Sequence, residues 1–152
     1  TVIDLEHRLI LFVVIVPTCL LAVFESFLFP EPPPDLRDAL IGGLVGFGIY
    51  FVIFLGGIAF SALTGTSEVA FGFGDVMLAT LSGLLLGWRA FFLALVITVF
   101  LGAGGAVLYL ASRVALRSRY RLFTPIPYGP YIVLGTVIML FWREEVRALL
   151  LP

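Results

Sequence analysis

The sequence predicts an all-α protein: a polytopic bundle of transmembrane helices that forms a single domain over residues 1–152. Three observations support this prediction: 61% of the residues are hydrophobic, only 12% are charged, and the mean hydropathy is +1.16. A soluble domain of this size carries about twice that charged fraction. We therefore expect a lipid bilayer, rather than water, to surround most of the chain.

Five apolar segments are candidates for membrane spans. A span needs about 20 mainly apolar residues to cross a hydrocarbon core of about 30 Å. Proline-rich or polar stretches separate the segments, except between the third and the fourth, where the Trp88-Arg89 pair predicts a tight turn. We expect about five spans, at residues 9–28, 39–60, 75–88, 90–111 and 126–142.

Glycines gather on particular predicted helices, often four residues apart. Small residues let helix backbones approach each other in lipid, where hydrophobicity alone gives helices no reason to associate. We therefore predict close helix packing at these glycines and assign them no chemistry. The set comprises Gly42, Gly46, Gly83, Gly87, Gly102, Gly104 and Gly105.

The distribution of arginine predicts the orientation of the chain, because short positively charged loops stay in the cytoplasm during insertion. The loop at residues 112–124 contains several arginines and no acidic residue, so we expect it to be cytoplasmic. Counting spans back from it puts the loop at residues 61–74 and the N-terminal stretch TVIDLEHR on the same side.

The composition also excludes several classes of function. The formal net charge is -1, so no basic surface is expected to attract nucleic acid. Cys19 is the only cysteine, which excludes an intramolecular disulfide and a cysteine-cluster metal site, and we expect no metal or cofactor to be bound by these residues. Because the sequence begins with Thr1 rather than Met, we expect an N-terminally truncated chain.

Two acidic residues, Asp4 and Asp75, lie at the predicted cytoplasmic ends of helices. Acidic residues near a hydrocarbon phase are costly to ionise and are candidates for a functional site. Each could instead be a helix N-cap, because Asp accepts hydrogen bonds from unpaired backbone N–H groups at a helix start. Gly72 and Gly74, however, remove side-chain bulk next to Asp75, which an ordinary cap does not need.

A pair of carboxyl groups can hydrolyse a peptide bond without a metal. When two carboxyl groups share a site, their repulsion raises the pKa of one of them, so that one proton is held between them. The ionised carboxyl deprotonates a water while the protonated one polarises the peptide carbonyl. The residues that other hydrolytic mechanisms need are missing from the sequence. No GxSxG motif occurs, and His7, the only histidine, is interpreted as an interfacial polar residue.

The segment GFGDVMLATLSGLLLGW, residues 72–88, resembles the GxGD signature of the type IV prepilin leader peptidases and related preflagellin peptidases, which are membrane aspartic proteases. TVIDLEHRLI resembles the family's stretch around its first catalytic aspartate, and PIPYGPYIVLG its P.GP motif. The resemblance implies that Asp4 and Asp75 are the catalytic pair. It also implies the site-shaping residues Gly72, Gly74, Pro127, Gly129 and Pro130. The P.GP residues could alternatively form only a helix entry, since proline is well tolerated in a helix's first turn.

The resemblance implies an aspartic-type endopeptidase that cleaves the leader peptide of type IV prepilins or pseudopilins. The site would lie on the cytoplasmic side of the prokaryotic inner membrane, with the prepilin helix and the lipid bilayer as partners. Many members also methylate the new N-terminus with S-adenosylmethionine, helped by an N-terminal region that often holds zinc. Neither group is expected within residues 1–152; either would need that missing N-terminal region.

Two departures from the family pattern leave alternatives open. The family usually has a proline shortly after the first aspartate, where this chain has Ile10-Leu11-Phe12, and often a lysine two positions after the second, where this chain has Met77. One alternative is an inactive relative. Another is a non-enzymatic membrane subunit, such as a transporter or a component of secretion or pilus assembly, in which the aspartates only cap helices.

Overall fold

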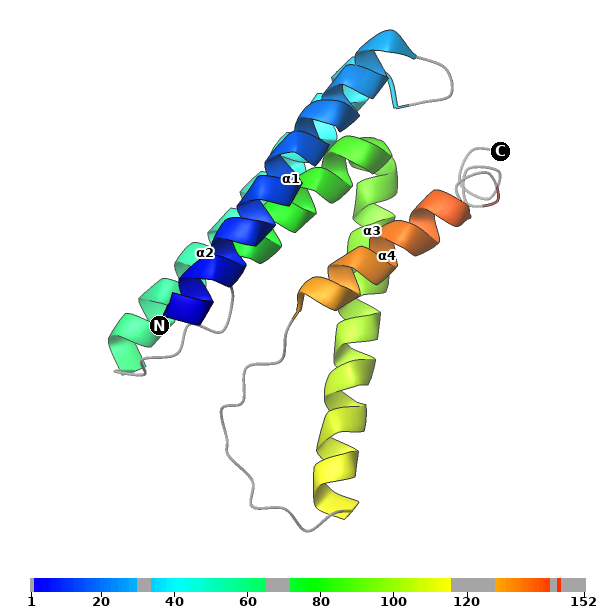
Figure 1. Cartoon of the computed structure of the whole chain (residues 1–152). Coiled ribbons are helices and arrows are strands. Elements are labelled where there is room, and N and C mark those ends of the chain that lie inside the picture. Colours follow the sequence, from blue (N-terminus) through cyan, green and yellow to red (C-terminus); the bar gives the residue numbers. More distant parts are fainter. Residues whose placement is uncertain (1, 30–33, 65–71, 116–127, 143–144, 146–152) are drawn as a thin grey trace.

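The computed structural model describes residues 2–29, 34–64, 72–115, 128–142 and 145; side chains are described from Val13 onward, except at residues 113–115. These residues form four helices and no strand, which confirms the all-α prediction (Figure 1). The helices are α1 (Val2–Leu28), α2 (Leu36–Thr64), α3 (Phe73–Ala115) and α4 (Gly129–Phe141).

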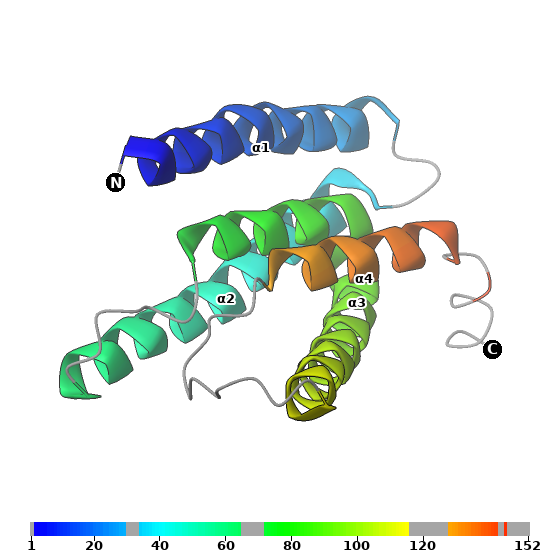
Figure 2. The same cartoon turned by 60° about the horizontal axis from the view of Figure 1, so that its bottom comes forward.

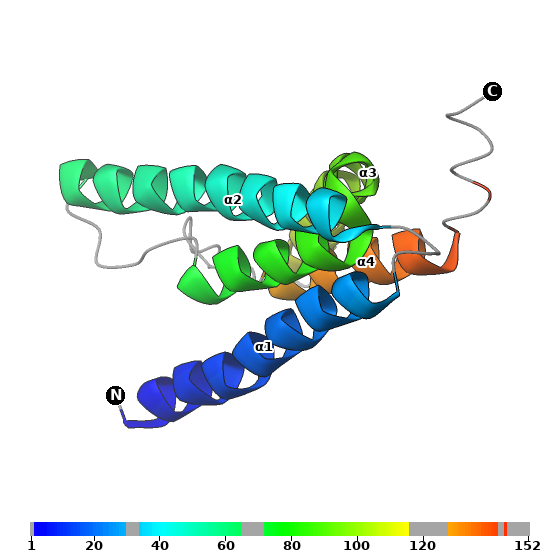
Figure 3. The same ribbon diagram turned by 90° about the horizontal axis from the view of Figure 1, so that it is seen from above.

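The first part of α3 lies between α2 and α1, as Figures 2 and 3 both show. Helix α2 packs extensively against α3, whereas α1 packs mainly against α3 and only slightly against α2. Helix α4 packs against α3 as well. The N-terminal ends of α1 and α3 lie at the same end of the bundle in all three views.

Helix α3 bends sharply at Gly87, and its second part runs away from α1 and α2 (Figure 1). Gly87 has φ 73° and ψ 166°, a backbone conformation that glycine adopts readily and other residues rarely do. A Cβ at this position would also lie 3.0 Å from the Cβ of Pro34. The bend comes one residue before the Trp88-Arg89 pair, where a turn between two spans was predicted.

Two helices, not five, are long and apolar enough to count as candidate membrane spans: Leu36–Thr64 and Phe73–Ser112, with hydropathies of 2.2 and 2.5. The prediction of five spans was therefore wrong for the described residues. The expected spans at 75–88 and 90–111 correspond to the two helical parts of α3, which meet in a kink at Gly87, where the backbone is not helical.

The expected spans at 9–28 and 126–142 fall on α1 and α4, and the expected span at 39–60 lies within the candidate span Leu36–Thr64. Counted from Val13, where the described side chains begin, the apolar segment of α1 ends at Leu28 and is too short to count as a candidate span, as is Gly129–Phe141 of α4. The last span was expected to start before α4 does, and residues 126 and 127 lie outside the described residues.

Much of the apolar surface of α2 and α3 faces outward. Only 28% of the most apolar window of α2, and 22% of that of α3, is buried inside the protein. Large side chains such as Leu63 and Phe100 are 87% and 74% exposed. A core helix of a soluble protein would be mostly buried, and water solvates such an apolar surface poorly. The exposure therefore supports a bilayer as the surrounding medium.

Glycines allow α2 and α3 to approach closely. A Cβ on Gly42 would clash with the backbone of Gly83, and a Cβ on Gly83 with the backbone of Gly42. A Cβ on Gly46 would lie 2.5 Å from the carbonyl oxygen of Ala79. The prediction of close helix packing is confirmed at these three glycines.

The other glycines of the predicted set behave differently. Gly102 lies against the ring of Tyr128, and Gly105 against the hydroxyl of Tyr131, so each makes room for a side chain rather than for a helix backbone. A Cβ on Gly104 would meet no described atom within 4 Å, so the prediction of close packing was wrong there.

Hydroxyl groups join α4 to both parts of α3. The Thr136 hydroxyl donates to the Ser82 hydroxyl at 2.7 Å, before the bend. The Thr98 hydroxyl donates to the backbone carbonyl of Tyr131 at 3.3 Å, after the bend. Such hydrogen bonds help to associate helices in lipid. These hydrogen bonds hold helix α4 in the angle between the two parts of α3.

Replacing Gly46 by Leu tests the close approach of α2 and α3. We expect Gly46→Leu to lower the free energy of unfolding by about 1–3 kcal/mol, the usual cost of overpacking, because its side chain collides with Ala79. Gly48→Leu is the matched control: it gains the same helix propensity, and a Cβ there would meet nothing within 4 Å. Thermal or denaturant unfolding in detergent measures both variants, and equal stability would contradict the packing.

Candidate active site

Asp75 lies in the first turn of α3, two residues after the helix begins at Phe73. Its backbone N–H donates to the carbonyl oxygen of Gly72 at 3.1 Å. Its carboxylate in turn accepts a hydrogen bond from the backbone of Gly72. This reciprocal pattern resembles a capping box, in which the residue at the third helical position bonds back to the N-cap. Asp75 therefore contributes to the start of the helix without being the N-cap itself.

Gly129, the first residue of α4, lies directly against the Asp75 carboxyl. A Cβ on Gly129 would be 3.2 Å from Asp75 Oδ1 and 3.4 Å from Leu78 Cδ1. The structure thus brings together one residue of the GxGD signature and one of the P.GP motif, far apart in the sequence. The N-terminal ends of two helices, α3 and α4, thus meet at the same carboxyl.

The remaining site-shaping residues have varied positions. Pro130 follows Gly129 in the first turn of α4, a position that suits proline. Pro127 lies outside the described residues. Gly74 lies in the first turn of α3. A Cβ on Gly72 would be 3.9 Å from Asp75 Oδ2, an ordinary van der Waals contact, so the described neighbours do not by themselves require glycine there.

Asp4 lies in the first turn of α1, and its side chain is outside the described part of the chain. The N-terminal end of α1 lies at the same end of the bundle as that of α3 (Figures 1 and 3). Helix α1 also packs against α3. The helix ends that carry the two aspartates therefore lie at one end of the bundle.

Two tyrosines next to Asp75 were missed in the sequence. Tyr50 of α2 and Tyr128, directly before α4, both interact electrostatically with Asp75. Tyr50 is buried, and Tyr128 is half-buried. A signal for Tyr50 was present, since its hydroxyl is the only polar side-chain group in the expected span at residues 39–60. Tyr128 stands inside the P.GP motif itself.

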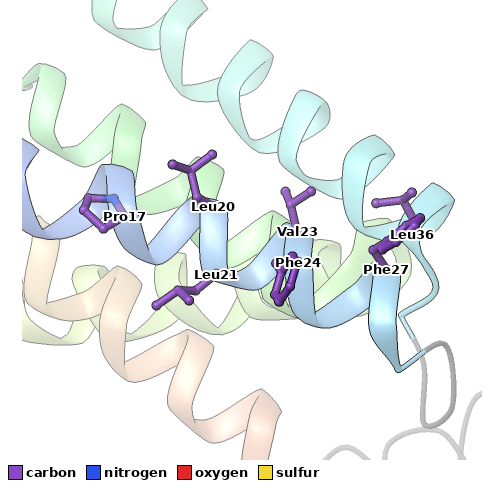
Figure 4. Close-up of a pocket in the computed structure, with 7 residues that line it drawn as sticks. All are labelled: Pro17, Leu20, Leu21, Val23, Phe24, Phe27 and Leu36. Carbon is purple, nitrogen blue, oxygen red and sulfur yellow. The ribbon is translucent and has the colours of Figure 1, made fainter.

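An apolar groove lies elsewhere, between the C-terminal half of α1 and the start of α2 (Figure 4). It is lined by Pro17, Leu20, Leu21, Val23, Phe24, Phe27 and Leu36. None of these side chains can transfer a proton or bind a metal. The groove therefore offers no group for acid–base or metal chemistry.

Metal-based hydrolysis has no candidate site in the described part of the chain. Within residues 13–29, 34–64, 72–112, 128–142 and 145, no group of three His, Cys, Asp or Glu side chains could hold a metal ion. The described site thus consists of one half-buried carboxyl between two helix N-termini, with two phenol groups beside it.

Comparison with known proteins relates this site to characterised relatives. The chain is 30% identical over 149 residues to the prepilin leader peptidase/N-methyltransferase of Pseudomonas aeruginosa, which covers 96% of this chain and 46% of that protein. It is 29% identical over 151 residues to the protein of the same name from Stutzerimonas stutzeri, covering 97% and 47%. With the Aeromonas hydrophila protein it shares 30% identity over 112 residues, 74% of this chain and 35% of that one.

The chain thus spans about half the length, or less, of these curated relatives. No solved structure matches it. The model of the type IV leader peptidase family matches residues 1–107, a stretch that includes both aspartates and ends before the P.GP motif. Covering well over half of the chain, this match shows that the chain belongs to the type IV leader peptidase family, as the sequence resemblance predicted.

Proposed function

We propose that this chain is the peptidase part of a membrane aspartic endopeptidase that removes the leader peptide from type IV prepilins or pseudopilins. The observation that supports this most is the position of Asp75: a half-buried carboxyl at the N-terminal ends of α3 and α4, in contact with the glycine of the P.GP motif. The family match and the names of the relatives point to the same substrate class.

In the proposed reaction, Asp4 and Asp75 share one proton and act on one water. The ionised carboxyl removes a proton from the water, and the protonated carboxyl polarises the carbonyl of the scissile peptide bond. The resulting tetrahedral intermediate collapses when the proton taken from the water passes to the leaving amine. Hydrolysis then needs neither a metal nor a covalent intermediate.

We place the reaction on the cytoplasmic side of the prokaryotic inner membrane. Two observations support this side. The arginine-rich sequence at residues 112–124 favours a cytoplasmic location. Both parts of α3 run away from the bend at Gly87 toward the same side, so the N-terminal ends of α3 and α1 lie on the side of the bend where the second part of α3 ends (Figure 1). The apolar stem helix of the substrate would lie in the bilayer beside the exposed apolar faces of α2 and α3.

The names of the relatives also include an N-methyltransferase activity. For residues 1–152 we propose only the peptidase reaction. No described residue is assigned to S-adenosylmethionine or to zinc, and methyl transfer would need protein beyond these residues.

The second candidate function is a non-enzymatic membrane subunit in which the aspartates only stabilise helix starts. The hydrogen bond from the Gly72 backbone to the Asp75 carboxylate favours this role for Asp75. The role does not account for the approach of Gly129 to the same carboxyl from another helix. Replacing the carboxyl by an amide separates the two functions, since an amide oxygen still accepts from Gly72.

We expect Asp75→Asn and Asp4→Asn each to lower the rate of prepilin leader removal by at least about 100-fold, because an amide cannot serve as a general base. Asp38→Asn is the matched control, since Asp38 is also an acid in the first turn of a helix but lies beside the bend at Gly87. Co-expression with a prepilin, followed by gel analysis of leader removal, measures all three variants.

Wild-type cleavage by either Asn variant would rule out the two-aspartate mechanism. If the wild-type chain itself leaves every tested prepilin and pseudopilin uncut, the peptidase proposal fails and the non-enzymatic subunit becomes the better account.

The contact between Gly129 and Asp75 gives a separate prediction. Gly129→Val should slow leader removal by about 10-fold to 100-fold, because the added atoms displace the carboxyl, and a misplacement of about 1 Å costs up to that much. Gly104→Val, where a Cβ meets no described atom within 4 Å, should keep the wild-type rate. Initial rates of leader removal in membranes measure both variants. Equal rates would show that the contact between Gly129 and the Asp75 carboxyl does not affect the reaction.

A further inference from the structure

Helices α2 and α3 pack antiparallel with a regular register. Gly42 meets Gly83, and one turn further along α2 Gly46 meets Ala79, one turn earlier in α3. Each step of four residues along α2 is thus matched by a step of four residues back along α3, as expected for two adjacent helices with about 3.6 residues per turn. The next step in this series pairs Tyr50 with Asp75.

A contact on the far side of this pair supports the same register. The rings of Phe54 and Phe73 lie edge to face, with their centroids 5.7 Å apart. Phe54 is one turn beyond Tyr50 on α2, and Phe73 is two residues before Asp75 on α3. Observed contacts therefore bracket the Tyr50–Asp75 pair on both sides.

The surroundings of Tyr50 make its hydroxyl unusual. Its side chain is only 3% exposed and belongs to the buried cluster that contains Val76 and Ala79, close neighbours of Asp75 in α3. Tyr50 and Asp75 also interact electrostatically. A buried phenol hydroxyl needs a hydrogen-bonding partner, and none of the buried side-chain N and O atoms in the described residues lacks one. A phenylalanine would fill the same space without this requirement.

We propose that Tyr50 is a positioning residue for the reaction: its hydroxyl, carried by α2, orients the Asp75 carboxyl toward the attacking water. This inference rests on the proposed peptidase function. A catalytic carboxyl has to be held within about 0.5 Å of its productive position by its neighbours. The backbone of Gly72 holds the Asp75 carboxyl at the start of α3, and Gly129 limits its movement on the side of α4. The Tyr50 hydroxyl holds it on the side of α2.

Tyr128 is a less suitable candidate, although it also interacts electrostatically with Asp75. Its ring lies against Gly102 and 6.1 Å from the ring of Tyr131. Tyr128 is also the N-cap residue of α4. A change at Tyr128 would therefore alter the packing of α4 together with the site.

Tyr50→Phe in the full-length chain, reconstituted with a purified prepilin, tests the proposal. We expect kcat to fall by about 10-fold to 100-fold, the effect that outer-shell partners and small misplacements of catalytic groups have, with KM and the melting temperature in detergent unchanged. Tyr109→Phe makes the same substitution on the second part of α3, away from Asp75, and should keep wild-type values.

A second variant separates the hydroxyl from the ring. Incorporation of 4-aminophenylalanine at position 50 restores a hydrogen-bond donor at the end of the ring and should recover most of the lost kcat. Recovery supports the positioning role, and a kcat that stays at the level of Tyr50→Phe overturns it.

Other outcomes would also count against the inference. A wild-type kcat for Tyr50→Phe would remove the positioning role while leaving the peptidase function intact. A fall in melting temperature that parallels the fall in kcat, or a rise in KM alone, would show a structural or substrate-binding role instead. Failure of the wild-type protein to cleave any prepilin would refute the proposed function, a result distinct from the others.

Discussion

The close approach of α2 to the first part of α3, through Gly42, Gly46 and Gly83, is the contact on which the rest of the described bundle depends. In lipid, helices gain little from burying apolar surface against each other, so backbone proximity and van der Waals contact have to stabilise the pair. Because the glycines fix the register, they also determine which residues meet further along. The same register, continued by one turn, pairs Tyr50 with Asp75, with which it interacts electrostatically.

The second determinant is the bend at Gly87, which converts one long helix into two arms with an angle between them. Helix α4 lies in this angle and is joined to both arms, by Thr136 to Ser82 and by Thr98 to the carbonyl of Tyr131. These contacts bring the start of α4 to the Asp75 carboxyl, so that Gly129 approaches it. The site is thus assembled from helix ends whose positions follow from packing elsewhere.

The sequence predicted the helical class, the apolar surroundings, the packing glycines of α2 and the position of a break near Trp88, because each depends on local composition. It did not predict that the break would be a kink at Gly87 in place of a turn at Trp88-Arg89, since glycine in an apolar run is compatible with both a turn and a kink. The proximity of Gly129 and Asp75 depends on tertiary packing, and only the family resemblance suggested a shared role. Tyr50 was missed because a single tyrosine in an apolar segment shows no periodic pattern, and its partner is defined only by the register between two helices.

The proposed mechanism requires the carboxyls of Asp4 and Asp75 to meet at one end of the bundle. Cross-linking measures this directly: Asp4→Cys and Asp75→Cys are combined in a Cys19→Ser background, with a protease site inserted between residues 65 and 71, and the protein is treated with a short bifunctional thiol reagent. The two-aspartate mechanism predicts that the two fragments stay joined after proteolysis, whereas they separate when Arg89→Cys replaces Asp75→Cys. The mechanism would be contradicted if the fragments separated with cysteines at positions 4 and 75. It would also be contradicted if the fragments stayed joined equally with cysteines at positions 4 and 89.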